Sequence, residues 1–201
     1  MKEEEDEDKI ELKAVLLGNS GVGKTNLINT CVGLEFKKDI NSTTTSGFVS
    51  KKVIKDGKEY IINLWDTAGQ EIYKSITKII IKKSKIVLFV YDITDRKSFD
   101  DLKEWIKIAK DIIDNEYISA IVGNKSDLFL NEQINEEEAR KFAEQNGMLF
   151  QLASAKETPK EFSLFLEDLI EEREGMSKSE IKEQINLTNE LIGKKTNACN
   201  C

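Results

Sequence analysis

Short runs of hydrophobic residues alternate along this chain with longer stretches in which hydrophobic positions recur at helical spacing. The Asp56-Gly57 pair favours a tight hairpin between two of these runs, which would make one edge strand antiparallel. Alternating strands and helices of this kind predict an α/β fold with a six-stranded, mostly parallel sheet and helices on both faces. The predicted strands lie near residues 10–17, 47–55, 59–65, 86–91, 117–122 and 148–152, and the predicted helices near 26–32, 98–114, 135–146 and 159–172.

Residues 18–25 read Gly-Asn-Ser-Gly-Val-Gly-Lys-Thr and lie between the first predicted strand and the first helical pattern. This fits the phosphate-binding loop G-x-x-x-x-G-K-[ST], in which backbone N–H groups and the helix N-terminus face the phosphates. Lys24 is expected to contact the β- and γ-phosphates, and the Thr25 hydroxyl to bind Mg²⁺. A glycine-rich turn before a helix is the plain structural alternative, which the strand–loop–helix context disfavours. The predicted phosphate-binding residues are Ser20, Gly21, Val22, Gly23, Lys24 and Thr25.

Residues 124–127 read Asn-Lys-Ser-Asp and follow the fifth predicted strand, at the sheet edge where open α/β sheets bind ligands. The Asp127 carboxylate can accept hydrogen bonds from the N1–H and N2–H₂ groups of guanine, a donor pair that adenine lacks. Alone, this tetrapeptide could be a helix-capping turn. Because it follows a phosphate loop and is itself followed by Ser-Ala-Lys at 154–156, it predicts that the base of the bound nucleotide is guanine. The predicted base-binding residues here are Asn124, Lys125, Asp127, Ser154, Ala155 and Lys156.

Residues 65–71, Trp-Asp-Thr-Ala-Gly-Gln-Glu, follow the third predicted strand. Asp66 would end this strand close to Mg²⁺. Gly69 can present its N–H to the γ-phosphate because no side chain blocks the approach, and Gln70 can align the attacking water. Read as structure only, the same residues form an Asp-initiated turn with a permissive glycine.

These motifs, in this order, resemble those of Rab-type small GTPases of the Ras superfamily. The resemblance extends to residues 90–95, Val-Tyr-Asp-Ile-Thr-Asp, and to Cys-Asn-Cys at 199–201. It implies a P-loop G domain at residues 10–173, which would bind GTP or GDP with Mg²⁺, hydrolyse GTP, and recruit effectors in vesicle traffic. A tail at 174–201 would be mostly flexible, or would form a short amphipathic helix that docks a partner.

The resemblance also assigns residues that the motifs alone leave undefined. Thr43 matches the switch I threonine that binds Mg²⁺ and the γ-phosphate, although Thr44 and Thr45 follow and the assignment could slip by one. Phe36 matches an aromatic residue that packs against guanine, or it is a plain core contact. Lys24, Thr43 and Gln70 would then carry catalysis. Because no arginine lies near the motifs, we expect slow intrinsic hydrolysis and stimulation by an arginine from an activating protein.

Partner-binding positions depart from the Rab pattern. Phe48, Trp65 and Ile80 match three positions that commonly form an exposed aromatic effector surface, but Ile80 is not aromatic and could instead point into the core. Cys199 and Cys201 match an ending that receives two geranylgeranyl groups, enough for stable membrane anchoring. A disulfide at that separation would be strained, and a two-thiolate metal site lacks further ligands.

The composition of the chain excludes several classes of function and of partner. The 201 residues are 39% hydrophobic and 33% charged, with no histidine and a formal net charge of −7. The lack of histidine excludes a Ser-His-Asp or Cys-His catalytic site. The net negative charge argues against nucleic acid as a binding partner. Most of residues 1–9 are charged, which predicts a disordered N-terminal arm. No apolar run is long enough to span a membrane, so we expect a cytoplasmic monomer held by lipid on the cytosolic face of an endomembrane.

The same resemblance implies protein partners: an exchange factor, an activating protein, effectors and a GDI or escort protein. Two other function classes stay open. One is a GTP-binding scaffold with little or no hydrolysis. The other is a nucleoside kinase, which would need an arginine-rich lid, and neither Arg96, Arg140 nor Arg173 lies near a plausible one.

Overall fold

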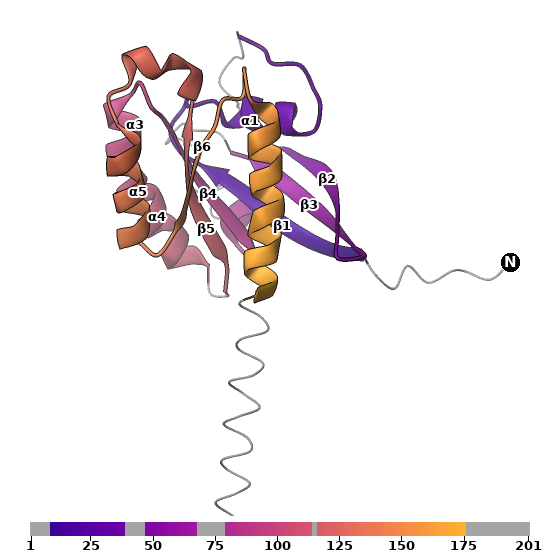
Figure 1. The fold of residues 1–201 in the computed structure, drawn as a ribbon. Helices are drawn as coiled ribbons and strands as arrows, with labels where there is room; N and C mark the ends of the chain where they lie inside the picture. The colour runs from indigo at the N-terminus through magenta and orange to yellow at the C-terminus, as the bar shows by residue number, and fades with distance from the viewer. Residues whose placement is uncertain (1–8, 39–46, 68–78, 114–115, 176–201) are drawn as a thin grey trace, which may run out of the picture.

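A computed structural model describes residues 9–38, 47–67, 79–113 and 116–175 of the chain (Figure 1). Six strands form a single sheet in the order β2-β3-β1-β4-β5-β6. Only β2 and β3 run antiparallel, while β1 pairs in parallel with β3 and β4, and β5 with β4 and β6. The strands are β1 (Lys9–Leu17), β2 (Gly47–Lys55), β3 (Lys58–Asp66), β4 (Ile86–Asp92), β5 (Ile118–Asn124) and β6 (Leu149–Leu152). The predicted α/β fold is confirmed.

Helices cover both faces of this sheet because the central strands are hydrophobic on both sides. In β1, Leu16 belongs to one buried cluster and its neighbour Leu17 to the other, as alternating strand residues must. The first cluster includes α1 (Lys24–Cys31) and the helix at 159–175, and the second includes α3 (Arg96–Asp100), α4 (Leu102–Ile112) and α5 (Glu136–Gln145).

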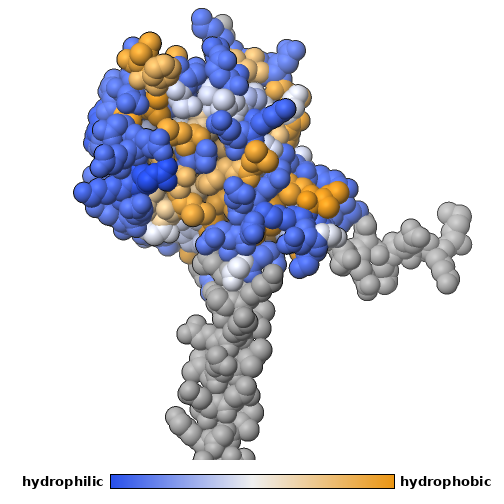
Figure 2. Space-filling view, viewed as in Figure 1, coloured by the Kyte–Doolittle hydropathy of each residue, from blue (hydrophilic) through white to orange (hydrophobic). Residues whose placement is uncertain are grey.

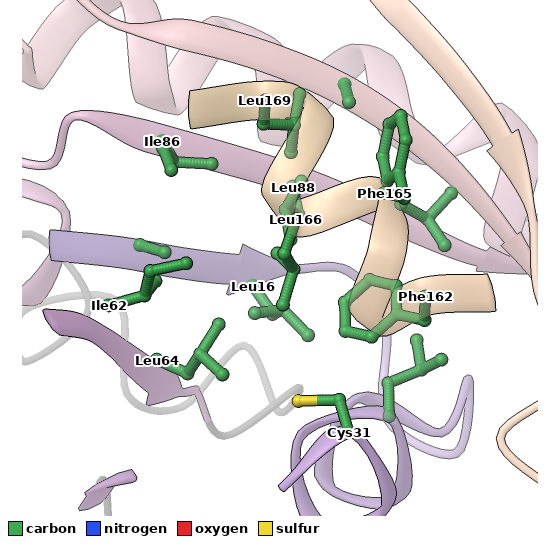
Figure 3. Packing of buried hydrophobic residues seen from close by; sticks show 14 of the residues in the cluster. Leu16, Cys31, Ile62, Leu64, Ile86, Leu88, Phe162, Phe165, Leu166 and Leu169 are labelled. Carbon is green, nitrogen blue, oxygen red and sulfur yellow. The ribbon is translucent and has the colours of Figure 1, made fainter. Parts of the chain in front are cut away.

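Figure 3 shows the first cluster, where Phe162, Phe165 and Leu169 of the helix at 159–175 pack over the strands. Phe162 and Leu169 are 1% and 0% exposed. This packing holds the long helix across the middle of the sheet, and it leaves the carboxyl ends of β1, β4 and β5 for the connecting loops (Figure 1).

The observed elements differ from the predicted ones mainly at their ends. The single helix predicted at 98–114 is instead two helices, α3 and α4, and the first begins at Arg96 because the Asp95 side chain accepts a hydrogen bond from the Lys97 N–H and caps it. The helix at 159–175 runs past its predicted end at 172, where Glu174 lies 3.8 Å from the Lys58 ammonium. A short 3₁₀ helix, η2 (Ser126–Asn131), was not predicted.

Two predicted boundaries therefore shift slightly. Lys9, assigned to the disordered arm, is the first residue of β1 and pairs with Glu59. Glu174 and Gly175, assigned to the flexible tail, continue the last described helix. The rest of the arm and of the tail, with Cys199 and Cys201, lies outside the described residues.

Candidate nucleotide-binding site

The phosphate loop connects the end of β1 to the start of α1, and close packing dictates the glycines at its two ends, Gly18 and Gly23. A Cβ on Gly18 would lie 2.1 Å from the carbonyl oxygen of Val90 in β4. A Cβ on Gly23, which has a φ of 93° and caps α1, would lie 2.3 Å from the Asn124 Nδ2 atom. Only glycine fits at either position. The loop is thereby pressed against the ends of β4 and β5, with the N-terminus of α1 at its centre.

Lys24 places a buried ammonium group inside this loop. Its Nζ atom donates to the carbonyl oxygens of Gly18 and Asn19, each at 2.8 Å, and the residue is only 5% exposed. Burial lowers the pKa of Lys24 to about 8, although the Asp66 carboxylate opposes this shift. The loop therefore holds a cation in a desolvated position, where it would interact strongly with an anionic ligand.

Thr25 and Asp66 bring two hard oxygen ligands together beside Lys24. The Thr25 hydroxyl donates to the Asp66 Oδ2 atom at 2.7 Å, joining α1 to the end of β3. The next residue, Thr67, is 1% exposed and donates to the Leu16 carbonyl oxygen at 2.6 Å, which fixes the chain as it leaves the sheet.

A hydroxyl and a carboxylate fit Mg²⁺, which is typically bound by one or two carboxylates together with phosphate oxygens and waters. No cluster of three or more acidic, cysteine or histidine ligands occurs among the described residues. The Thr25 hydroxyl and the Asp66 carboxylate suit a metal that takes its other ligands from a phosphate and from water.

Asn124, at the end of β5, connects the phosphate loop to the Ser-Ala-Lys loop. Its Nδ2 atom donates to the Val22 carbonyl oxygen at 2.8 Å, and its Oδ1 atom accepts from the Ala155 N–H at 3.3 Å. Asn124 is 2% exposed. One buried amide thus fixes the distance between the two halves of the site.

Asp127 is oriented by Ser154, and Lys125 by Asp92. The Ser154 hydroxyl donates to the Asp127 Oδ1 atom at 2.6 Å and accepts from the Glu157 N–H at 2.9 Å. Lys125 has a left-handed backbone with φ of 64°, and its ammonium lies 2.5 Å from the Asp92 carboxylate. The hydrogen bond from Ser154 thus orients the Asp127 carboxylate, and the ion pair with Asp92 holds the Lys125 side chain.

The remaining predicted residues lie at the rim or outside the described part of the chain. Phe36 is 38% exposed, and the exposed Lys156 side chain pairs with Glu157 at 2.6 Å. Ser20 and Gly21 lie in the phosphate loop, both exposed. Thr43, Gly69 and Gln70 are outside the described residues.

The three predicted effector positions do not form one exposed group. The rings of Phe48 and Trp65 stack with centroids 5.0 Å apart, and Phe48 is 54% exposed. Ile80 is 5% exposed and packs in the second buried cluster, whereas its neighbour Ile79 is 76% exposed. The assignment of Ile80 to the surface is therefore wrong, because its side chain faces the core.

Sequence reasoning also missed three features of the site. Asp92 ends β4 and anchors Lys125, yet nothing in the sequence distinguished it from a turn residue. Asn19 contacts α4 through its side chain. Directly after Asp127, η2 exposes the hydrophobic residues Leu128, Phe129 and Leu130, at the upper left of Figure 2. Three consecutive hydrophobic residues were the available signal for this last feature.

Comparison with known proteins identifies the family to which this site belongs. The model of the Ras family matches residues 13–173. The chain belongs to the Ras family. This Ras-family chain is 39% identical over 145 residues to Ras-related protein RGP2 of Oryza sativa subsp. japonica, covering 72% of the chain and 67% of that protein. It is 38% identical over 152 residues to GTP-binding protein ypt3 of Schizosaccharomyces pombe, covering 76% of the chain and 71% of that protein.

The Ras-family chain is thus a Rab-like small GTPase of the Ras superfamily, as the resemblance predicted. Members of this family are GTP-binding switches. Within the described part of this chain, every helix is too short or too polar to cross a membrane.

Proposed function

We propose that this Ras-family switch binds GTP and GDP at the carboxyl edge of its sheet, through the residues predicted from its motifs. The observation that supports this most is the Asn124 amide, which bridges Val22 in the phosphate loop and Ala155 in the Ser-Ala-Lys loop. Such a bridge holds a phosphate cradle and a base-recognising carboxylate at a constant separation. One ligand that contains both a phosphate chain and a guanine ring would use both.

Competition between nucleotides tests this proposal. Nucleotide-free protein with Mg²⁺ should bind GDP and GTP at least about 100-fold more tightly than ADP and ATP, because adenine leaves the Asp127 carboxylate without its donor pair. Calorimetry or displacement of a fluorescent nucleotide measures this ratio. Equal affinity for the two bases would refute the proposal.

The proposed hydrolysis needs little covalent chemistry. Lys24 and the loop amides would stabilise charge on the β- and γ-phosphoryl oxygens, and Gln70 would align water. Thr25, Asp66 and Thr43 would hold Mg²⁺, which would supply further positive charge there. Gly69 would donate its N–H to the γ-phosphate. Loss of that phosphate would release the segments that carry Thr43 and Gly69, which is the proposed switch.

Hydrolysis should be slow without help, since an arginine supplied by an activating protein contributes about 10³–10⁵ in rate in this class. Gln70→Leu should bind GTP normally but scarcely hydrolyse it in single-turnover phosphate release. Normal turnover of this variant would contradict the assigned role. A wild-type protein that binds GTP but releases no phosphate, even with an activating protein, would favour the scaffold alternative.

We further propose that the switch acts in vesicle traffic, anchored to the cytosolic face of an endomembrane by geranylgeranyl groups on Cys199 and Cys201. Phe48 and Trp65 would form the apolar centre of its effector surface. Their stacked and partly exposed rings support this role. An exchange factor and a GDI or escort protein would complete the cycle.

The double substitution of Cys199 and Cys201 by Ser tests the anchor. It should move the protein from the membrane fraction to the soluble fraction of cells, with nucleotide binding unchanged. Membrane association that persists in this variant would refute the lipid model.

A further inference from the structure

Asn19, the second residue of the phosphate loop, is held from outside the loop by helix α4. The indole N–H of Trp105 donates to the Asn19 Oδ1 atom at 3.0 Å. The Asn19 Nδ2 atom donates to the Asp101 Oδ2 atom at 2.7 Å. Asp101 immediately precedes α4 and Trp105 lies in its first turn, so both partners come from one rigid segment.

The backbone of the same residue contacts the buried cation. The Asn19 carbonyl oxygen accepts a hydrogen bond from the Lys24 Nζ atom at 2.8 Å. The two side-chain hydrogen bonds fix Asn19 against the start of α4, and they therefore restrain the backbone rotation that would move this carbonyl. Because Trp105 is only 6% exposed, its indole is fixed by the core and cannot follow such a movement.

We propose that Asn19 is a positioning residue for the phosphate site, and that its hydrogen bonds to Asp101 and Trp105 control how long a nucleoside diphosphate stays bound. The inference rests on the proposed nucleotide function. It adds helix α4, which lies outside the phosphate loop, as a determinant of nucleotide release.

The chemistry of the two partners requires an amide at this position. An indole N–H can only donate and an ionised carboxylate can only accept, so the residue between them must offer one acceptor and one donor. The hydrogen bond from Asn19 lowers the pKa of Asp101, a shift that burial opposes. Asp101 therefore remains charged at neutral pH, and its Oδ2 atom accepts from Asn19 while it also pairs with the Lys97 ammonium at 3.3 Å.

An aspartate in place of Asn19 would set two carboxylates against each other at the present 2.7 Å separation. Like charges this close repel strongly when they are partly removed from water. The repulsion should turn residue 19 and displace the carbonyl that holds Lys24. Exchanging the two residue types would restore one donor and one acceptor with their direction reversed, because an amide at 101 can donate to a carboxylate at 19.

Release of a fluorescent GDP from full-length protein in Mg²⁺ tests the proposal, with thermal unfolding of each nucleotide-bound variant measured in parallel. Asn19→Asp should release GDP about tenfold faster than wild type. The double variant Asn19→Asp/Asp101→Asn should return to within about twofold of wild type. Asn19→Ala, which removes both contacts without adding charge, should release GDP about threefold faster.

Asp100→Asn is the matched control, since Asp100 is the adjacent acid, is exposed, and pairs with Arg96 rather than with the phosphate loop. It should release GDP at the wild-type rate. If Asn19→Asp does not fold, Asn19→Ala against Asp100→Asn decides the question.

Wild-type release rates in both Asn19 variants would overturn the inference. So would faster release that the double variant fails to reverse while its unfolding temperature recovers. The same series measured with fluorescent ADP separates this inference from the proposed function. Equal retention of ADP and GDP by wild type would refute guanine specificity, but the order of release rates among the variants would still test Asn19.

Discussion

The phosphate side of the proposed site is organised around a buried ammonium held by backbone carbonyls, whereas the base side is organised around contacts between side chains. Lys24 is 5% exposed, and backbone carbonyls accept both of its described hydrogen bonds. Asp127 is instead oriented by the Ser154 hydroxyl, and Lys125 is paired with Asp92. The phosphate side should therefore supply most of the binding free energy and its dependence on pH through Lys24, and the base side should supply discrimination between bases.

The largest effect should come from removing the buried charge. Lys24→Met should weaken GDP binding by about 100-fold, the value of a charge-assisted hydrogen bond or two in a desolvated site. It should also raise the unfolding free energy of the nucleotide-free protein at pH 7, because an ammonium is no longer kept out of water. Calorimetry and chemical denaturation measure the two quantities.

Lys110→Met, an exposed lysine on α4, is the control for this change and should alter neither quantity. If Lys24→Met destabilised the nucleotide-free protein, Lys24 would be a structural residue of the loop. The contrast between the two sides of the site would then fail.

How far the sequence predicts such a site depends on whether a residue acts locally or through a distant partner. The phosphate loop and the Asn-Lys-Ser-Asp turn were predictable because each is a continuous segment whose spacing encodes its backbone. The Asn124 bridge to Val22 and Ala155 was not, since it joins three segments that only the sheet order brings together.

Ile80 is a second residue whose placement depends on packing partners that are distant in the sequence. The sequence offers Ile79 and Ile80 side by side, and a helix can bury either one. Only the position of the helical residues 79–81 against β1 and β4 decides that Ile80 packs in the core and Ile79 does not.

The next largest effect tests discrimination on the base side. Asp127→Asn should weaken GDP binding by about 30-fold, because the amide replaces an acceptor with a donor that faces the guanine N2–H₂ group. Xanthine carries a carbonyl at that position, so xanthosine diphosphate should bind the variant better than GDP does. Competition between the two nucleotides measures the exchange.

Ser154→Ala is a graded companion to this change, since it removes the hydroxyl that orients Asp127 without altering the carboxylate. Binding of GDP should weaken by less than in Asp127→Asn, and guanine should remain preferred. A variant of Asp127 that still prefers GDP would show that discrimination lies elsewhere.

A smaller effect should appear when pH alone is changed. Lys24 has a pKa of about 8 in the folded, nucleotide-free protein against 10.5 as its ordinary value. The unfolded chain therefore binds more protons between these values. The stability of the nucleotide-free protein should rise as pH increases from 8 to 10.5, and be lost again as pH falls through 8.

Nucleotide binding should show the opposite trend, because bound phosphate favours the charged amine. Between about pH 8 and pH 9, GDP affinity should fall by up to about tenfold with uptake of a proton. Titration calorimetry in buffers of different ionisation enthalpy measures that uptake. Asp127→Asn should keep the same slope, and a slope that disappeared in this variant would contradict the separation of the two sides.

The smallest effect concerns packing beneath the base side. The Tyr91 hydroxyl is buried against the Gly123 backbone and has no hydrogen-bond partner among the described residues. Burial raises the pKa of Tyr91, so the group stays a neutral hydroxyl. Tyr91→Phe should raise the unfolding free energy by about 1 kcal/mol, because an unsatisfied buried hydroxyl costs about that much. GDP affinity should change by less than about twofold, since Asn124 and Asp127 keep their own contacts.

Denaturant unfolding and calorimetry on the same preparation measure the unfolding free energy and the GDP affinity of Tyr91→Phe. If the variant were less stable than wild type, the Tyr91 hydroxyl would help to position the end of β5.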